Sequence, residues 1–212
     1  MTLILDVGSG NSLPDMDTVH ELLAAIKEVD SGKHTIILKA QIFEDVPPNK
    51  PILKCVFSQL HKYGNENRYK VTASVFDIPS LKYLLDYDIP FVKIACRTDL
   101  YWLIGEVPRK IPVYVSIADE RGYGAIQGYS NTTWLFCVPK YPALLFDYEA
   151  VPSWAPGFPL SHAWISDHTE GWALYHKYHP EVLEKHIVLE RSPDNPDSGP
   201  FAITPSDLKE IM

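Results

Sequence analysis

Cysteine, long apolar segments and basic residues are all scarce in this sequence of 212 residues. The three cysteines, Cys55, Cys96 and Cys137, are widely spaced and form no CxxC pair, which argues against a disulfide framework or a thiolate zinc site. No apolar run is long enough to span a bilayer, and the apolar start from Met1 to Leu5 has no basic residues before it and ends at Asp6. We therefore expect a cytoplasmic protein with free thiols, without a signal peptide or a membrane segment.

Basic residues are outnumbered by acidic ones. Nineteen Lys and Arg face 27 Asp and Glu, which gives a formal charge of -8 and a pI near 5.4. This balance, with no basic cluster to offset it, argues against nucleic acid as a partner because phosphate backbones require a basic surface. If the substrate is an anion, a few lysines, an arginine or a metal ion must make its site locally positive.

The hydrophobic content of 46% is enough for a full core, and we predict a single domain over residues 1–212. Eight short apolar runs typical of buried parallel strands recur along the chain, most of them separated by helical patterns. These runs are Leu3 to Val7, Thr35 to Ala40, Lys70 to Phe76, Phe91 to Cys96, Pro112 to Ile117, Thr133 to Val138, Ala163 to Ser166 and His186 to Leu189. The alternation predicts a (β/α)₈ TIM barrel, with an open doubly wound sheet as the alternative.

Helical patterns are clear only in the first half of the chain. The segments 15–29, 51–63, 78–87 and 98–105 have helical spacing, whereas residues 119–131 are too rich in glycine to predict a helix. Residues 139–161 are rich in proline and aromatic residues, which indicates irregular loops or single helical turns, and short helices are expected at 170–178 and 206–212. We therefore expect a compact barrel with shortened or missing helices in its second half.

Polar residues end most of the predicted strands. In barrels the active site lies at the carboxyl ends of the strands, where two ammonium groups and several hydroxyls could hold a phosphate and a carboxylate. Taken singly, such residues often end strands only because solvent begins there. The candidates are Asp6, Lys39, Gln41, Ser74, Lys93, Cys96, Ser116, Tyr141, Ser166, His168 and His186.

Two histidines stand out among these candidates. His168 follows the seventh predicted strand and His186 opens the eighth, so adjacent parallel strands would bring their imidazoles together, surrounded by Asp167, Glu184 and Asp197. Neutral imidazole is a good ligand for Mn, Fe, Zn or Co. A single histidine at a strand end is more often a hydrogen-bonded surface or core residue, but the pair predicts a shared divalent metal.

The sequence around both histidines resembles the sialic acid synthase family, whose members condense phosphoenolpyruvate with N-acetylmannosamine or a related sugar. The family has a Y-S-D-H-T-like turn and then L-E-K-H-F-T-L-D-R-x-x-x-G-P-D. Here Ile165 to Thr169 reads I-S-D-H-T, and Leu183 to Asp197 reads L-E-K-H-I-V-L-E-R-S-P-D-N-P-D. The segments L-K-A-Q from Leu38 and V-K-I-A-C from Val92 are similar to the family's phosphoenolpyruvate-binding segments.

The resemblance implies a role for each candidate residue. His168 and His186 would hold a divalent metal, expected to be Mn²⁺, and would act in catalysis together with Asp6 and Lys93. The substrates, phosphoenolpyruvate and an amino sugar, would be bound by Lys39, Gln41, Ser74, Cys96, Ser116, Tyr141, Ser166 and Asp197.

The sequence also departs from the family pattern. Cys96 replaces a serine, Thr98 an acidic residue and Pro139 an asparagine or serine. Family members usually extend into a C-terminal antifreeze-like domain that covers the partner's active site, so we interpret the chain as a barrel-only member, with a homodimer or a lid-supplying partner protein as candidate assemblies.

Two other functions are compatible with the sequence. One is a metal-dependent sugar aldolase or epimerase, in which Lys39 or Lys93 could form a Schiff base if buried with a depressed pKa. The other is a catalytically degenerate barrel that binds a sugar or a protein, because a fold does not guarantee an activity.

Overall fold

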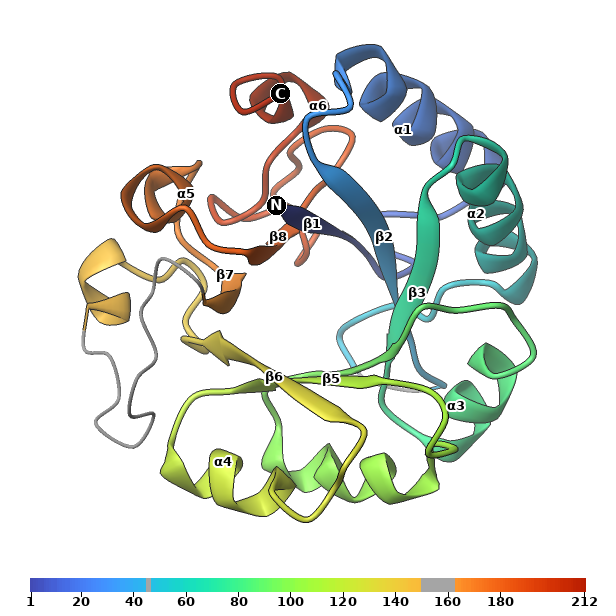
Figure 1. Cartoon of the computed structure of the whole chain (residues 1–212). Coiled ribbons are helices and arrows are strands. Elements are labelled where there is room, and N and C mark those ends of the chain that lie inside the picture. Colours follow the sequence, from blue (N-terminus) through green and yellow to red (C-terminus); the bar gives the residue numbers. More distant parts are fainter. Residues whose placement is uncertain (45–46, 150–162) are drawn as a thin grey trace.

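Eight parallel strands close into a barrel in chain order, with the helices around its outside (Figure 1). The structure is a computed structural model, which describes residues 1–44, 47–149 and 163–212. The closure confirms the predicted (β/α)₈ barrel and excludes the open sheet. The strands are β1 (Thr2–Gly8), β2 (Thr35–Ile42), β3 (Lys70–Val75), β4 (Val92–Ile94), β5 (Val113–Ile117), β6 (Thr132–Cys137), β7 (Trp164–Asp167) and β8 (Val182–His186).

The helices become shorter along the chain, as expected. The two longest are α1 (Met16–Val29), capped by the Asp15 carboxylate, and α2 (Lys54–Glu66). The others are α3 (Ile78–Leu84), the 3₁₀ helix η1 (Thr98–Glu106), α4 (Glu120–Ile126), the 3₁₀ turn η2 (Leu145–Tyr148), α5 (Ala173–Tyr178) and α6 (Pro205–Leu208). Of the predicted irregular segment 139–161, residues 150–161 lie outside the described residues. None of the described helices is long and apolar enough to cross a membrane.

The strand side chains alternate between two environments. The outward-facing residues pack with the helices in one large apolar core that includes Leu5, Leu38 and Val115. The inward-facing residues at the amino ends form a separate apolar cluster, Ile4, Ile37, Phe91, Leu135 and Val182, which fills the bottom of the barrel. The next inward-facing positions toward the carboxyl ends are polar, so this apolar layer forms the floor of whatever site lies above it.

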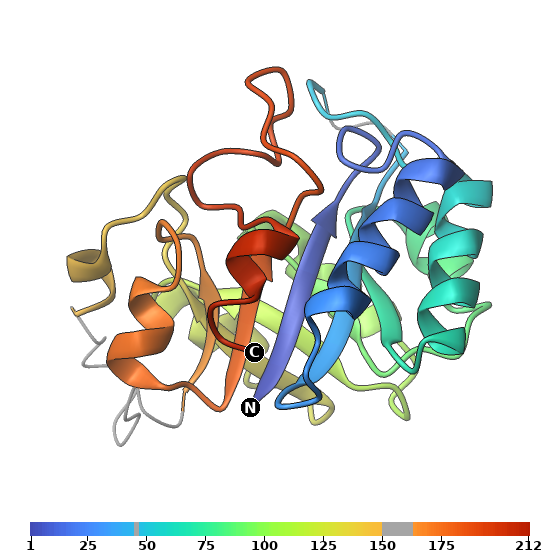
Figure 2. The same ribbon diagram turned by 90° about the horizontal axis from the view of Figure 1, so that it is seen from above.

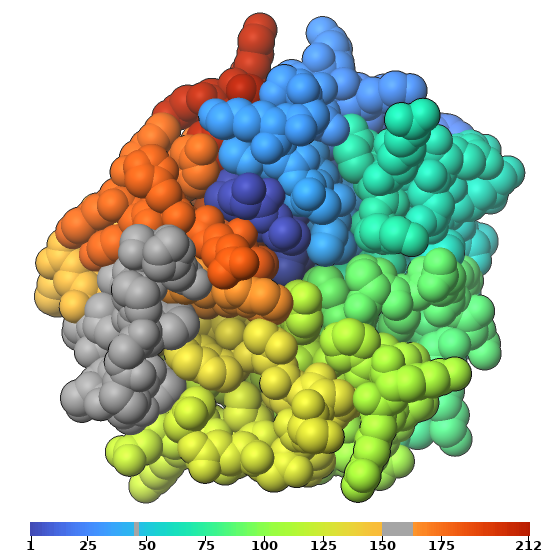
Figure 3. All heavy atoms as spheres, in the orientation of Figure 1, coloured from blue at the N-terminus to red at the C-terminus, as the bar shows by residue number. Residues whose placement is uncertain are grey.

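The loops at the carboxyl ends of the strands rise above the barrel. In Figure 2, the loops after β2 and β8 project beyond the tip of β1, on the side toward which that strand points. In the space-filling view the colours follow one another around the molecule in chain order (Figure 3). Each βα unit therefore lies beside the next, and every strand end contributes to the same rim.

One element contradicts the sequence prediction in residues 119–131, where no helix was expected. Helix α4 forms there because the Asp119 carboxylate caps it, accepting a hydrogen bond from the Gly122 amide at 2.8 Å. A Cβ added at Gly122 would lie 3.3 Å from Cβ of Ile117, so glycine allows the helix to approach β5 closely. The glycine that argued against a helix thus serves its packing.

The eighth strand was also predicted wrongly, four residues too late. The sequence predicted His186 to Leu189, whereas β8 covers Val182–His186, so that His186 ends the strand instead of opening it. Its consecutive Glu184, Lys185 and His186 are unlike a buried strand in sequence, yet all three are buried. A strand can contain them because Glu184 and His186 line the pocket, whereas Lys185 pairs with Asp167.

Candidate functional site

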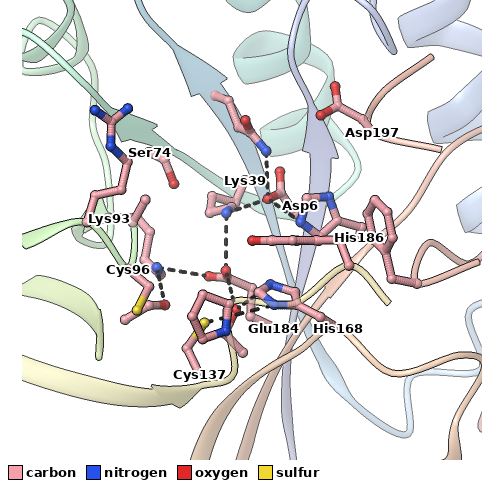
Figure 4. A pocket seen from close by; sticks show the side chains of 18 of the residues that line it. Asp6, Lys39, Ser74, Lys93, Cys96, Cys137, His168, Glu184, His186 and Asp197 are labelled. Carbon is pink, nitrogen blue, oxygen red and sulfur yellow. Dashed lines mark hydrogen bonds and ion pairs between the residues drawn. The ribbon is translucent and has the colours of Figure 1, made fainter. Parts of the chain in front are cut away.

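A cavity of about 550 Å³ opens at the carboxyl ends of the strands. All twelve predicted site residues line it, including Asp197 from the loop after β8. In Figure 4 the two lysines, the two histidines and the carboxylates of Asp6 and Glu184 are directed toward one another. The structure thus brings the predicted residues together, whereas their individual roles remain predictions.

Strand register explains this convergence. Asp6 on β1 is the register partner of Lys39 on β2 and of His186 on β8. Ser166 on β7 is likewise the partner of Glu184 on β8. Because partners in a parallel barrel stand at the same height and inward-facing residues alternate, one polar layer forms from several strands.

A network of buried charges crosses the centre of the cavity. Lys39 Nζ lies 2.6 Å from Asp6 Oδ2 and 3.3 Å from Glu184 Oε1. Lys93 Nζ lies 3.7 Å from Glu184 Oε2 and donates to Ser116 Oγ at 2.7 Å. Each of the four charged side chains is at most 5% exposed, so two ammonium groups and two carboxylates offset one another away from solvent.

Burial and pairing set the ionisation of this network. Burial alone would favour neutral Asp6, but the Lys39 ammonium and His186 outweigh it and hold the pKa of Asp6 at about 2. Burial would raise the pKa of Glu184, but Lys39 and Lys93 outweigh this effect and lower it. Burial lowers the pKa of Lys93, whereas Asp6 and Glu184 raise the pKa of Lys39 against the effect of burial. Both carboxyl groups are therefore ionised at neutral pH.

The two imidazoles lie side by side, with ring centroids 5.8 Å apart. His168 Nδ1 lies 2.8 Å from the carbonyl oxygen of Val138, so it donates there and leaves Nε2 as the available lone pair. Burial lowers the pKa of His168 to about 3, which keeps the ring neutral. His186 Nδ1 is buried and has no hydrogen-bond partner in the part of the chain that the structure describes. The ring of Tyr141 packs against His168 with a centroid distance of 4.1 Å.

This pair fits a divalent cation. Imidazole nitrogens bind such ions at about 2.1 Å, a length compatible with two rings at this separation. The ring nitrogens of His186 and Nε2 of His168, which lies 3.4 Å from Ser166 Oγ, are the kind of donor atoms that a metal needs. In the described parts of the chain, no third His, Cys, Asp or Glu joins them in a group that could hold a metal. The protein would therefore supply two ligands and leave the other positions open.

A second ion pair lies one residue before each histidine. Asp167 and Lys185 are register partners, and Lys185 Nζ lies 3.0 Å from Asp167 Oδ2, with both side chains fully buried. Lys185 also donates to the carbonyl oxygen of Thr169, and Asp167 Oδ1 accepts from the Thr169 amide at 2.7 Å. This pair ties β8 to the turn that carries His168, and so helps to fix the spacing of the two imidazoles.

The loop after β8 is anchored to the loop after β1 through Asp197. Asp197 Oδ2 accepts hydrogen bonds from the Ser9 amide and the Ser9 hydroxyl, both at 2.9 Å. Gly8 has a φ of +78°, and a Cβ there would lie 2.6 Å from Asp197 Oδ2, so this turn requires glycine. The anchor holds Asp197 at the pocket wall.

The NeuB family model matches residues 52–212, which is most of the chain. This chain belongs to the NeuB family. The resemblance drawn from the sequence is thereby confirmed, and membership supports the coarse function of a phosphoenolpyruvate-condensing sugar synthase. No match was found among curated proteins.

Solved structures agree with the family assignment at the level of the fold. A sialic acid synthetase from Leptospira borgpetersenii is 20% identical, with a TM-score of 0.72 over 99% of this chain and 80% of that one. A spore coat polysaccharide biosynthesis protein from Bacillus subtilis is 22% identical, with a TM-score of 0.75 over 99% and 65%. A truncated 3-deoxy-D-arabino-heptulosonate 7-phosphate synthase from Thermotoga maritima is 14% identical, with a TM-score of 0.69 over 100% and 83%.

Among the pocket residues of this NeuB-family chain that were not predicted as site residues are Glu184 and Cys137. Glu184 was expected only near the histidines, but it lies between both lysines. It stands two residues before His186, and in a strand this spacing puts both side chains on the same face, which could have indicated that Glu184 faces the pocket. Cys137, predicted only as a free thiol, lines the same pocket as Cys96, and the interaction of the two thiols lowers the pKa of Cys96 and raises the pKa of Cys137. No sequence pattern linked these two cysteines.

The ion pair of Asp6 predicts a specific pH dependence of stability. Because the folded-state pKa of about 2 lies below the ordinary 3.8, the stabilisation is complete above about pH 4 and is lost as the pH falls through 2. The shift corresponds to about 2 kcal/mol. We expect the difference in unfolding free energy between the wild type and Asp6→Asn, measured by urea unfolding, to shrink as the pH falls over this range. The exposed Asp17→Asn is the control and should show no such change. A deficit that stays constant with pH would contradict this account.

Proposed function

We propose that this NeuB-family protein condenses phosphoenolpyruvate with N-acetylmannosamine or a related aldose to form a nonulosonic acid and inorganic phosphate. The convergence of two buried lysines and two imidazoles in one cavity of about 550 Å³ is the observation that supports this proposal. C3 of phosphoenolpyruvate would attack the aldehyde carbon, water would add to C2, and phosphate would leave as the C2 ketone forms.

The anionic substrate would bind on the lysine side of the pocket. Lys39 and Lys93 would hold the phosphate and carboxylate groups, with hydroxyl donors from Ser74, Ser116 and Ser166. Their main contribution would be to position the substrate and stabilise its charge, since these groups are fixed by packing before the substrate arrives.

The aldose would bind on the opposite side. Asp6 and Asp197 would accept hydrogen bonds from its hydroxyl or amide groups, while Gln41, already bonded to Asp6 at 3.0 Å, and Tyr141 would orient it. His168 and His186 would hold a divalent cation, which we propose is Mn²⁺. When bound, this ion would supply Lewis acidity that polarises the aldehyde carbonyl.

The test is phosphate release from phosphoenolpyruvate across a panel of hexosamines, with Mn²⁺ and with a chelator. We expect release only when an aldose and the metal are both present. Failure of the protein to bind phosphoenolpyruvate or Mn²⁺ in calorimetry would overturn the proposal and favour a degenerate binding barrel.

The depressed pKa of Lys93 favours one alternative, an aldolase that uses a Schiff base. Lys93 Nζ donates to Ser116 Oγ and to the carbonyl oxygen of Ile94 at 3.0 Å, and these bonds hold its ammonium group in place to bind an anion. We therefore expect borohydride to trap no adduct with a keto acid. A stable adduct at Lys93 would replace the condensation mechanism.

A further inference from the structure

Glu184 lies where an anionic ligand of the two lysines would bind. Its Oε1 is 3.3 Å from Lys39 Nζ, and its Oε2 is 3.7 Å from Lys93 Nζ (Figure 4). Ser166, a predicted phosphate or carboxylate ligand, donates to Oε1 at 3.0 Å. The carboxylate thus already uses three of the groups that would bind the substrate.

The lysines do not need Glu184 to stay in place. Lys39 forms its closer ion pair with Asp6, at 2.6 Å. Lys93 is held by Ser116 Oγ at 2.7 Å and by the carbonyl oxygen of Ile94. Removing the charge of Glu184 while keeping its shape should leave both ammonium groups where they are.

Glu184 is also not optimally bonded. The residue is 4% exposed, and within the described residues its Oε2 is buried without a hydrogen-bond partner. A buried carboxylate with an unsatisfied oxygen is unfavourable for folding, and such exceptions in native proteins are often functional. The ion pairs with both lysines stabilise the charged form of Glu184, and the unsatisfied Oε2 is the feature that points to a function beyond stability.

We infer that the negative charge of Glu184 limits how tightly the Lys39–Lys93 pair binds phosphate, so that the phosphate released in the reaction can leave. This inference rests on the proposed function. Two buried ammonium groups would otherwise hold a phosphate dianion strongly, because charge-assisted hydrogen bonds gain strength in a low dielectric. Tight product binding would slow each turnover.

The experiment compares phosphate binding by the wild type with that by Glu184→Gln. Titration calorimetry with inorganic phosphate should show at least about tenfold tighter binding by the variant, because a full negative charge close to the anion is removed. Glu184→Asp, which keeps the charge, should bind as weakly as the wild type. Glu210→Gln, an exposed glutamate paired with His176, is the matched control and should not change phosphate affinity.

Several outcomes would overturn the inference. Unchanged or weaker phosphate binding by Glu184→Gln would do so, as would tighter binding by Glu184→Asp, since the effect would then be steric. A thermal unfolding midpoint of Glu184→Gln well below that of the wild type would show that the charge serves stability. Tighter binding should also appear as stronger inhibition of turnover by added phosphate.

Failure of this inference differs from failure of the proposed function. If the wild type releases phosphate from phosphoenolpyruvate but Glu184→Gln binds phosphate no better, only the role of Glu184 is wrong. If neither protein binds phosphate or phosphoenolpyruvate, the proposed function itself fails.

Discussion

Replacing His168 or His186 by alanine is expected to reduce metal-dependent phosphate release by about a thousandfold or more. Each imidazole would supply one of only two protein ligands, since no further His, Cys, Asp or Glu groups with them among the described residues. Loss of either ring would leave one ligand, which cannot hold the ion in place. The measurement is phosphate release with Mn²⁺, together with electron paramagnetic resonance of Mn²⁺ to measure binding directly.

His176→Ala is the matched control for this prediction. His176 is exposed on α5 and pairs with Glu210, far from any predicted role, so its loss should leave activity and Mn²⁺ binding unchanged. Thermal unfolding of each variant shows whether the fold survives, which matters for His168 because it also bonds Val138. Wild-type rates in folded His168→Ala or His186→Ala would refute the metal role assigned to the pair.

Lys185→Met is expected to destabilise the protein by about 3–5 kcal/mol. The substitution would leave the Asp167 carboxylate fully buried without its cation, 3.0 Å from where the ammonium was. Urea unfolding measures the loss. Lys177→Met removes an exposed lysine paired with Glu149, and as the control it should change stability by about 0.5 kcal/mol or less.

A double variant tests whether the pair also positions the histidines. Asp167→Asn combined with Lys185→Met removes both charges and should recover part of the lost stability. If the ion pair helps to fix the spacing of His168 and His186, the double variant should still bind Mn²⁺ more weakly than the wild type. A Lys185→Met variant less than about 1 kcal/mol less stable than the wild type would contradict the account of this pair.

Much of the site could be predicted from the sequence because barrels place function at strand ends. Lys39, Lys93, Ser166 and His168 each stand near the end of an apolar run, and the structure brings all of them to one pocket. The motifs around His168 and His186 also indicated the family, and the family model confirms that assignment.

Other features could not be predicted, because they depend on contacts between distant segments. The effect of Cys137 on the pKa of Cys96 joins residues from β6 and from the loop after β4, on either side of β5. The glycine-rich stretch of α4 could be recognised as a helix only once Gly122 was seen against Ile117 of the barrel wall.

The sequence by itself determined the eight-stranded architecture and the predicted set of pocket residues, because strands buried on both faces leave continuous apolar runs that polar residues interrupt only near the ends. Only the tertiary structure decided where β8 ends and what Glu184 contacts. Closing the barrel places β8 beside β1 and points Glu184 and His186 inward, where they line the pocket, while Lys185 pairs with Asp167. Three consecutive charged or polar residues can therefore lie in a buried strand, because each finds its partner on another strand.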